Sequence, residues 1–262
     1  MRRWKRYAAI AETSARQTLI ARGEVVARAI FFGLLLLVFS RLWAVMEAEG
    51  QLEGVRAANF IWYLALTEWV VLATPLLYLT IEEDIRRGDL AYRLTRPLSY
   101  LGAKLAEGVG ELCVRFVTLG ALGFFITWWF VGALPPQPSA LIAAIPVAFL
   151  SMLLLLLFQL AIGLSAFWLH EAAPVYWILQ KLLFVFGGLL FPLDIYPDWL
   201  AAISSWTPFA AAIYGCGRFA FGIDAVGVLQ QLWLLVVWMA LTFLALAWLF
   251  RRATRIVQVH GG

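Results

Sequence analysis

The sequence predicts an all-α integral membrane protein with six transmembrane helices. Hydrophobic residues make up 63% of the 262 residues, charged residues only 14%, and the mean hydropathy is +0.86. A soluble domain has about 45–50% apolar and about 25% charged residues, so this chain cannot cover a soluble fold with polar surface. The same composition excludes intrinsic disorder, nucleic-acid-binding modules and secreted disulfide scaffolds.

Residues 1–22 are predicted to form an amphipathic helix at the membrane interface. Trp4, Ala11 and Leu19 share one face at helical spacing, with basic residues around them. Such helices lie in the interface, where anionic lipids attract them. The alternative is an unstructured basic tail. No short apolar run with a small-residue cleavage site occurs in the first 24 residues, so no removable signal peptide is expected.

Six apolar runs are long enough to cross a hydrocarbon core of about 30 Å. They lie at 25–46, 57–80, 112–131, 140–169, 174–191 and 228–250. Residues 192–227 are also apolar, but prolines and glycines interrupt them. Because non-helical backbone cannot face lipid, we expect 192–227 to form a re-entrant or surface hairpin packed on the bundle. Residues 1–262 then form a single membrane domain.

The basic residues predict the orientation. Six spans place both termini on one side, and 16 of the 20 lysines and arginines lie in segments on that side, against three on the other. Basic residues accumulate on the cytoplasmic side of membrane proteins. We therefore expect a multi-pass protein of the cell inner membrane with both termini cytoplasmic. The net charge of +4 then reflects topology and does not indicate a nucleic-acid partner.

No catalytic or metal-binding pattern is visible. A P-loop needs Gly-Lys-Ser/Thr, but the three lysines follow Trp4, Ala103 and Gln180. His170 and His260 lie too far apart for a zinc-protease helix. We expect no catalytic residue, no metal and no cofactor in this chain.

The loop 81–100 carries acids first and arginines later, an order that suits the dipole of a short helix. Gly88 permits a break in this helix, and Pro97 disfavours helical geometry at the residue before the proline. The loop is either a solvated connector whose arginines enforce topology or a docking element for a cytoplasmic partner. After it, Glu107, Glu111 and Arg115 recur every four residues. We expect them to form local ion pairs on a cytoplasmic extension of the third span.

Three side chains within the spans are candidates for a translocation path. Glu68 lies inside the second span, where an ionisable group is costly and indicates function by default. It either faces the path with its charge, or is protonated or hydrogen-bonded to a neighbouring helix. Gln159 either joins helices or lines the path. Trp69 either packs or contacts cargo through its ring.

Two motifs carry a family resemblance. Residues 84–90 read Asp-Ile-Arg-Arg-Gly-Asp-Leu, and residues 94–100 read Leu-Thr-Arg-Pro-Leu-Ser-Tyr. Residues 187–200 read Gly-Gly-Leu-Leu-Phe-Pro-Leu-Asp-Ile-Tyr-Pro-Asp-Trp-Leu, and Trp-Thr-Pro-Phe follows at 206–209. In this order and position they resemble the permease subunits of ABC-2-type exporters, over nearly the whole chain.

The resemblance implies an ATP-driven exporter. Two permeases, identical or homologous, pair around a central path, and two separate ATPase subunits, which bind ATP and Mg, dock on cytoplasmic coupling helices. Here the coupling helix is the 82–96 segment between spans two and three. The implied coupling residues are Glu82, Glu83, Asp84, Ile85, Arg86, Arg87, Gly88, Asp89, Leu90, Arg93, Leu94, Arg96 and Pro97. Ile85, Leu90 and Leu94 would be the apolar anchors. Phe191, Pro192, Pro197 and Pro208 would belong to an outer hairpin or gate.

Two other classes stay open. A stand-alone secondary transporter or channel would need more ion-coupling residues than Glu68. An intramembrane enzyme is disfavoured by the missing catalytic groups. The cargo is not readable from the sequence.

Overall fold

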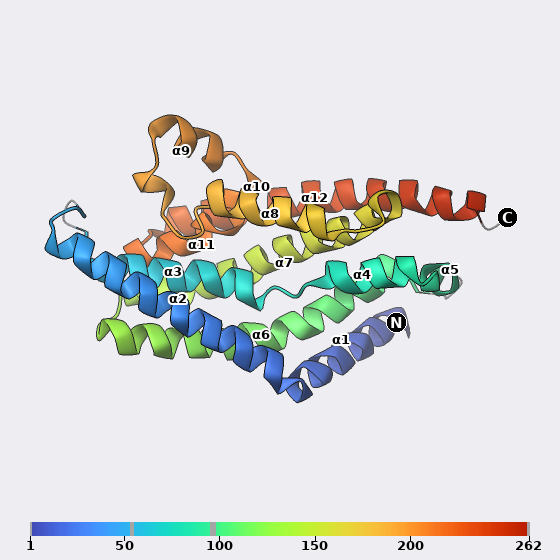
Figure 1. Cartoon of the computed structure of the whole chain (residues 1–262), viewed down its shortest axis with the longest axis horizontal. Helices are drawn as coiled ribbons and strands as arrows, with labels where there is room; N and C mark the ends of the chain where they lie inside the picture. Colours follow the sequence, from blue (N-terminus) through green and yellow to red (C-terminus); the bar gives the residue numbers. More distant parts are fainter. Residues whose placement is uncertain (1, 53–54, 95–97, 261–262) are drawn as a thin grey trace.

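The computed structural model describes residues 2–52, 55–94 and 98–260, and every regular element in them is helical. Figure 1 shows an elongated bundle with most helices along its long axis. The elements are α1 (Arg2–Ile20), α2 (Arg22–Ala48), α3 (Ala57–Ala73), α4 (Leu77–Arg86), α5 (Asp89–Leu94), α6 (Tyr100–Val131), α7 (Pro138–Leu169), α8 (Ala173–Val185), η1 (Leu193–Ile195), α9 (Asp198–Ser205), α10 (Pro208–Ala212), α11 (Tyr214–Gly217), η2 (Arg218–Phe221) and α12 (Ala225–His260).

Within the described chain, five helical segments are long and apolar enough to cross a membrane. They are Gly23–Ala48, Ala57–Arg86, Tyr100–Val131, Pro138–Leu169 and Ala225–Ala253. The expected all-helical, multi-pass architecture is therefore confirmed, but the expected count of six spans is not.

The difference lies in the fifth predicted span, 174–191. Its helix, α8, has 13 residues and ends at Val185. At about 1.5 Å per residue it is about 20 Å long, short of the hydrocarbon core. The helix stops because Gly187 and Gly188 follow it. Gly188 has φ +67°, a left-handed conformation that glycine adopts readily.

The second span also departs from expectation, because Pro75 breaks it into α3 and α4. The residue before a proline avoids helical geometry, and Thr74 has an extended ψ of 124°. The break leaves the carbonyl of Leu72 without its helical partner. Arg28 of α2 donates to this carbonyl at 2.6 Å. A charged side chain thus satisfies backbone that would otherwise be unpaired inside a membrane span.

Helix α6 begins at Tyr100, twelve residues before the apolar run at 112–131. Ser99 caps it by accepting a hydrogen bond from the backbone N–H of Gly102. The expected extension of this helix beyond the apolar run is therefore present.

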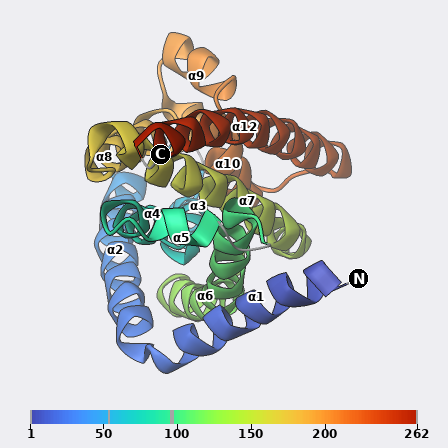
Figure 2. The same cartoon turned by 90° about the vertical axis from the view of Figure 1, so that its right-hand side faces the viewer.

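Helix α1 packs along this extension (Figure 2). Ser14 donates to the carbonyl of Glu107 at 2.8 Å, and the Tyr7 hydroxyl accepts from the backbone N–H of Ser99. On the apolar face predicted for the interface helix, Trp4 is 82% and Leu19 is 56% exposed, whereas Ala11 lies against Gly110 of α6. Its contact with lipid stays a prediction.

Substitution of Gly110 by alanine is expected to loosen α1 from α6. The added Cβ would lie 2.0 Å from the Ala11 carbonyl oxygen, so the helices would have to separate. Overpacking costs about 1–3 kcal/mol, which outweighs the gain of up to about 1 kcal/mol in helix propensity. Thermal unfolding in detergent measures the loss. The control is Gly33→Ala, whose Cβ would meet Ile126 at an ordinary 3.8 Å. Equal midpoints for the two variants would contradict the close approach.

The predicted hairpin, 192–227, contains only short helices before α12 begins at Ala225. α9 projects from the bundle in Figure 1, whereas α10, α11 and η2 pack inward against α3 and α7. The hydroxyls of Tyr63 and Thr67 on α3 donate to the carbonyls of Gly188 and Leu189, where α8 has ended. Gly217 lies so close to Tyr63 that a Cβ there would approach its ring to 2.4 Å. This segment is therefore fixed to the bundle core, while its depth in a membrane stays a prediction.

Different elements lie at the two ends of the bundle. Figure 1 shows both termini at the same end as α5, with α9 and the connection from α2 to α3 at the opposite end. Seen from the end with the termini, α3, α4 and α7 occupy the middle of the bundle (Figure 2). The span 57–86 is accordingly the most buried of the five. We call the two ends the terminal end and the distal end.

Candidate functional site

The predicted coupling segment forms two short helices at the terminal end of the bundle (Figure 1). α4 ends at Arg86 and α5 begins at Asp89. Gly88 lies between them with φ +74°, so the helix breaks where the sequence predicted. Since α4 continues the second span, this segment is joined directly to a membrane helix.

Asp84 fixes the segment to α6. Its side chain is 9% exposed and lies 3.1 Å from the nitrogens of both Arg93 and Lys104. The Tyr100 hydroxyl donates to it at 3.0 Å. Lys104, only 4% exposed, also pairs with Glu107 at 3.2 Å. Asp84 is therefore an internal anchor that joins α4, α5 and α6.

Glu82 fixes the segment to the turn between α7 and α8. Its carboxylate accepts from the backbone N–H of Ala172 at 2.9 Å and lies 3.5 Å from Arg86. Its side chain is 13% exposed. The second membrane span, α6 and the α7–α8 turn thus meet at one segment.

The opposite side of this segment is open and charged. Arg86 is 64% and Arg87 is 68% exposed, and Arg87 pairs with the exposed Glu83 at 2.6 Å. Asp89 and Tyr92 are exposed as well. We call Glu83, Arg86, Arg87, Asp89 and Tyr92 the coupling face.

The structure describes the side chain of only one of the three proposed apolar anchors. Ile85 is half-buried and packs against the bundle core. Leu90 and Leu94 lie on α5, but their side chains, together with Arg96 and Pro97, fall outside the described residues. The assignment of these residues as anchors for a partner stays a prediction.

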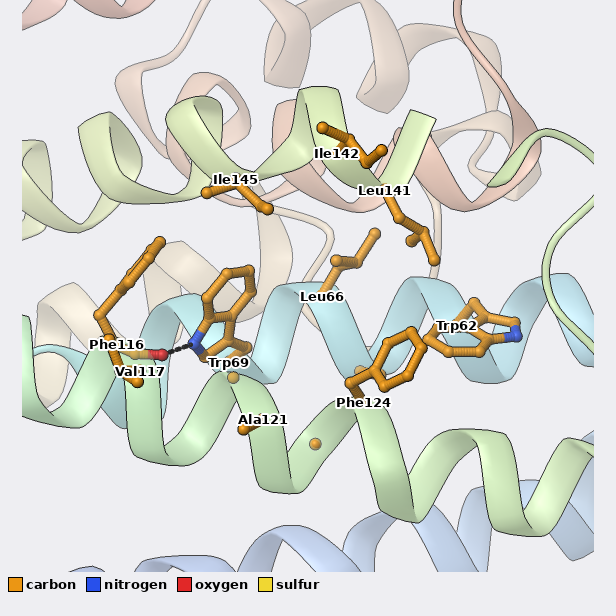
Figure 3. A pocket seen from close by; sticks show the side chains of 13 residues that line it. Trp62, Leu66, Trp69, Phe116, Val117, Ala121, Phe124, Leu141, Ile142 and Ile145 are labelled. Atoms are coloured by element: carbon orange, nitrogen blue, oxygen red, sulfur yellow. Dashed lines mark hydrogen bonds between the residues drawn. The ribbon is translucent and has the colours of Figure 1, made fainter. Parts of the chain in front are cut away.

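The three candidate path residues differ in their surroundings. Glu68 and Gln159 are each 4% exposed, so this chain's own helices enclose them. The Oε1 atom of Gln159 has no hydrogen-bond partner in the described chain. Trp69 instead lines an apolar pocket of about 370 Å³ between α3, α6 and α7. Figure 3 shows its indole N–H donating to the Phe116 carbonyl, at 3.0 Å.

The four hairpin residues lie in the segments that follow α8. Phe191 packs edge-on against Trp43 of α2, with ring centroids 5.7 Å apart. Pro192 is buried beside it. Pro197 directly precedes α9 and Pro208 is the first residue of α10, so each proline marks the start of a short helix.

A cluster of charges that the sequence did not reveal joins α2 to α6, and we call it the polar junction. Arg115, 3% exposed, pairs with Glu111 on its own helix and with Glu24 of α2 at 2.7 Å. Glu24 also pairs with Arg28 at 3.0 Å. Arg28 in turn reaches the carbonyl of Leu72 freed at the Pro75 break. The sequence spacing indicated ion pairs within α6 but not this connection between helices.

The arrangement fits transmission of motion better than chemistry. The exposed coupling face is joined through buried charges to several helices, and the polar junction sits where α1 and α2 meet α6. A family model described as "ABC-2 family transporter protein" matches residues 29–261. No curated protein matches the chain.

Proposed function

Since this chain belongs to the ABC-2 transporter family, we propose that it is the membrane-spanning permease of an ATP-driven exporter. It would work with two separate ATPase subunits, which bind ATP and Mg, and with a second permease of the same or homologous sequence. The chain itself would hold no cofactor. Export from the cytoplasm is the direction that the family resemblance implies.

The ATPase is proposed to dock on the coupling face. One observation carries this proposal: the face is exposed on one side and anchored on the other by Asp84 and Glu82. A push on Arg86 or Arg87 would therefore reach α6 and the α7–α8 turn through buried, short-range contacts. Ile85, Leu90 and Leu94 would complete the docking segment.

The proposed topology places the terminal end in the cytoplasm and the protein in the inner membrane. The concentration of basic residues at that end supports this orientation. In this arrangement α8, with the turns that follow it, makes the sixth crossing, and 192–227 forms the outer hairpin or gate. Glu68, Trp69 and Gln159 remain the proposed path residues.

Charge reversal at Arg87 should weaken ATPase binding. The variant Arg87→Glu places two acids where an exposed ion pair now stands, and like charges at an interface suppress association. Co-purification of the P-loop ATPase is expected to fall by about tenfold or more. The matched control is Arg16→Glu, which reverses an equally exposed i,i+4 pair on α1. If both variants retain the ATPase equally, docking on the coupling face is wrong.

Transport assays in liposomes test the function itself. Cargo movement should require the ATPase and ATP. Movement in the absence of any ATPase would overturn the proposal and favour a stand-alone transporter or channel.

A further inference from the structure

A second cavity lies at the distal end, away from the coupling face. Its volume is about 710 Å³, within the range of about 300–1,000 Å³ that is typical of small-molecule sites. Two parts of the chain far apart in the sequence form its walls: the end of α2 through the start of α3 (Trp43 to Phe60), and residues between Pro192 and Gly222. Most of the lining is apolar, including Trp43, Leu52, Val55, Phe60, Ile195 and Phe221.

One wall of this cavity carries a carboxylate that no cation neutralises. The Tyr214 hydroxyl lies 3.0 Å from both oxygens of Asp194. Burial and the neighbouring carboxylate raise the pKa of Tyr214 to about 12, so the hydroxyl stays protonated and donates. Within the described residues, no lysine or arginine lies within ion-pair distance of Asp194. Its negative charge is therefore oriented but unpaired.

An arginine lies near the same tyrosine. The guanidinium of Arg218 is 5.9 Å from the centroid of the Tyr214 ring, and this side chain also lines the cavity. No carboxylate of the described chain pairs with it. One cavity thus presents a negative and a positive group, and neither is held in an ion pair within the described residues.

Deep in the cavity wall, a hydrogen-bond donor is left unused. Trp43 is 1% exposed and stacks on Phe60 with ring centroids 4.2 Å apart. Its Nε1 atom has no acceptor in the part of the chain that the structure describes. That atom is itself buried, so a ligand in the cavity would meet the apolar ring of Trp43 and not its N–H.

We propose that the distal cavity binds the zwitterionic head group of a phospholipid from the adjacent leaflet. Asp194 would take the ammonium group and Arg218 the phosphate. The apolar wall, which includes the ring of Trp43, would hold the first part of the acyl chains. Two features favour a lipid: the cavity is lined from where one span ends at Ala48 and the next begins at Ala57, and it combines an acidic and a basic side chain with an apolar lining. Binding requires neither the ATPase nor transport.

Native mass spectrometry of the full-length protein in detergent tests this site. The probes are dihexanoyl phosphatidylethanolamine, dihexanoyl phosphatidylglycerol of the same chain length, and free phosphoethanolamine. We expect the first to bind about tenfold more tightly than either of the others, because only it offers both charges and an apolar chain. Asp194→Asn and Arg218→Gln should each weaken its binding about tenfold.

Matched controls are Asp198→Asn and Arg41→Gln, which alter exposed charges in α9 and α2 that do not line the cavity. Both should bind lipid as the wild type does. Asp194 and Arg218 are both exposed, so both variants should fold. Equal binding of the two lipids, or unchanged binding by Asp194→Asn and Arg218→Gln, would overturn the proposal. Free phosphoethanolamine binding as tightly as the lipid would replace it with a site for a soluble zwitterion.

Discussion

The variant Asp84→Asn is expected to lower the free energy of unfolding by about 3–5 kcal/mol, the cost of removing one partner from a buried ion pair. The large value follows from the burial of its partner. Lys104 is 4% exposed and would keep only Glu107 as a carboxylate neighbour among the described residues. The midpoint of thermal unfolding in detergent measures the effect. Asp89→Asn is the control, because Asp89 is exposed on the adjacent helix.

The same variant separates docking from coupling. The coupling face stays intact in Asp84→Asn, so the ATPase should still co-purify, while ATP-driven transport should fall further than association does. A double variant, Asp84→Asn with Lys104→Met, removes both buried charges and should be more stable than the sum of the single losses predicts. If Asp84→Asn is no less stable than Asp89→Asn, Asp84 is not an anchor.

The spans were predictable because long apolar runs are a direct signal of the membrane environment. Their interruptions were harder to predict. Pro75 is visible in the sequence, yet the apolar run continues past it, so hydropathy alone hides the break between α3 and α4. The fifth span ends early for a related reason, since Leu and Phe around Gly187 and Gly188 keep the hydropathy high while the backbone turns.

The coupling segment shows a different limit. Its position, its short helices and the break at Gly88 followed from the pattern of charges and from glycine chemistry. The sequence grouped Glu82, Glu83 and Asp84 as three similar acids. The structure separates them into two anchors and one exposed side chain, because a helix turns successive residues by about 100°. That division depends on which neighbouring helix lies on which side, and no local pattern contains it.

The polar junction shows the same limit across helices. Spacing by four identified the ion pair of Glu111 and Arg115, since such residues share a helix face. Glu24 and Arg28 have the same spacing on α2. Nothing in either helix indicates that the two pairs meet, because that contact is set by the packing of α2 on α6. The break at Pro75 frees the carbonyl of Leu72 from its helical hydrogen bond, and this unpaired carbonyl is a signal that could have suggested a nearby arginine.

Replacement of Arg115 by methionine is expected to destabilise the protein by about 2–3 kcal/mol, between the values typical of exposed and buried ion pairs. Arg115 is 3% exposed, but its partners are more accessible: Glu111 is 22% and Glu24 is 53% exposed. Water can therefore partly solvate the charges of Glu111 and Glu24 when Arg115 is removed. Methionine also relieves a cost, because Nε and Nη1 of Arg115 have no partner in the described chain. The loss should consequently be smaller than for Asp84→Asn.

A double-mutant cycle with Glu24→Gln distinguishes a link between helices from a local pair on α6. If the polar junction holds α2 on α6, the two changes together should cost less than the sum of their separate effects by about 0.5–3 kcal/mol. Arg16→Met is the control, since Arg16 pairs only with the exposed Glu12 among the described carboxylates and should change stability by less than about 1 kcal/mol. Strict additivity of Arg115→Met and Glu24→Gln would mean that their contact contributes nothing. In that case α2 would be held on α6 by apolar packing alone.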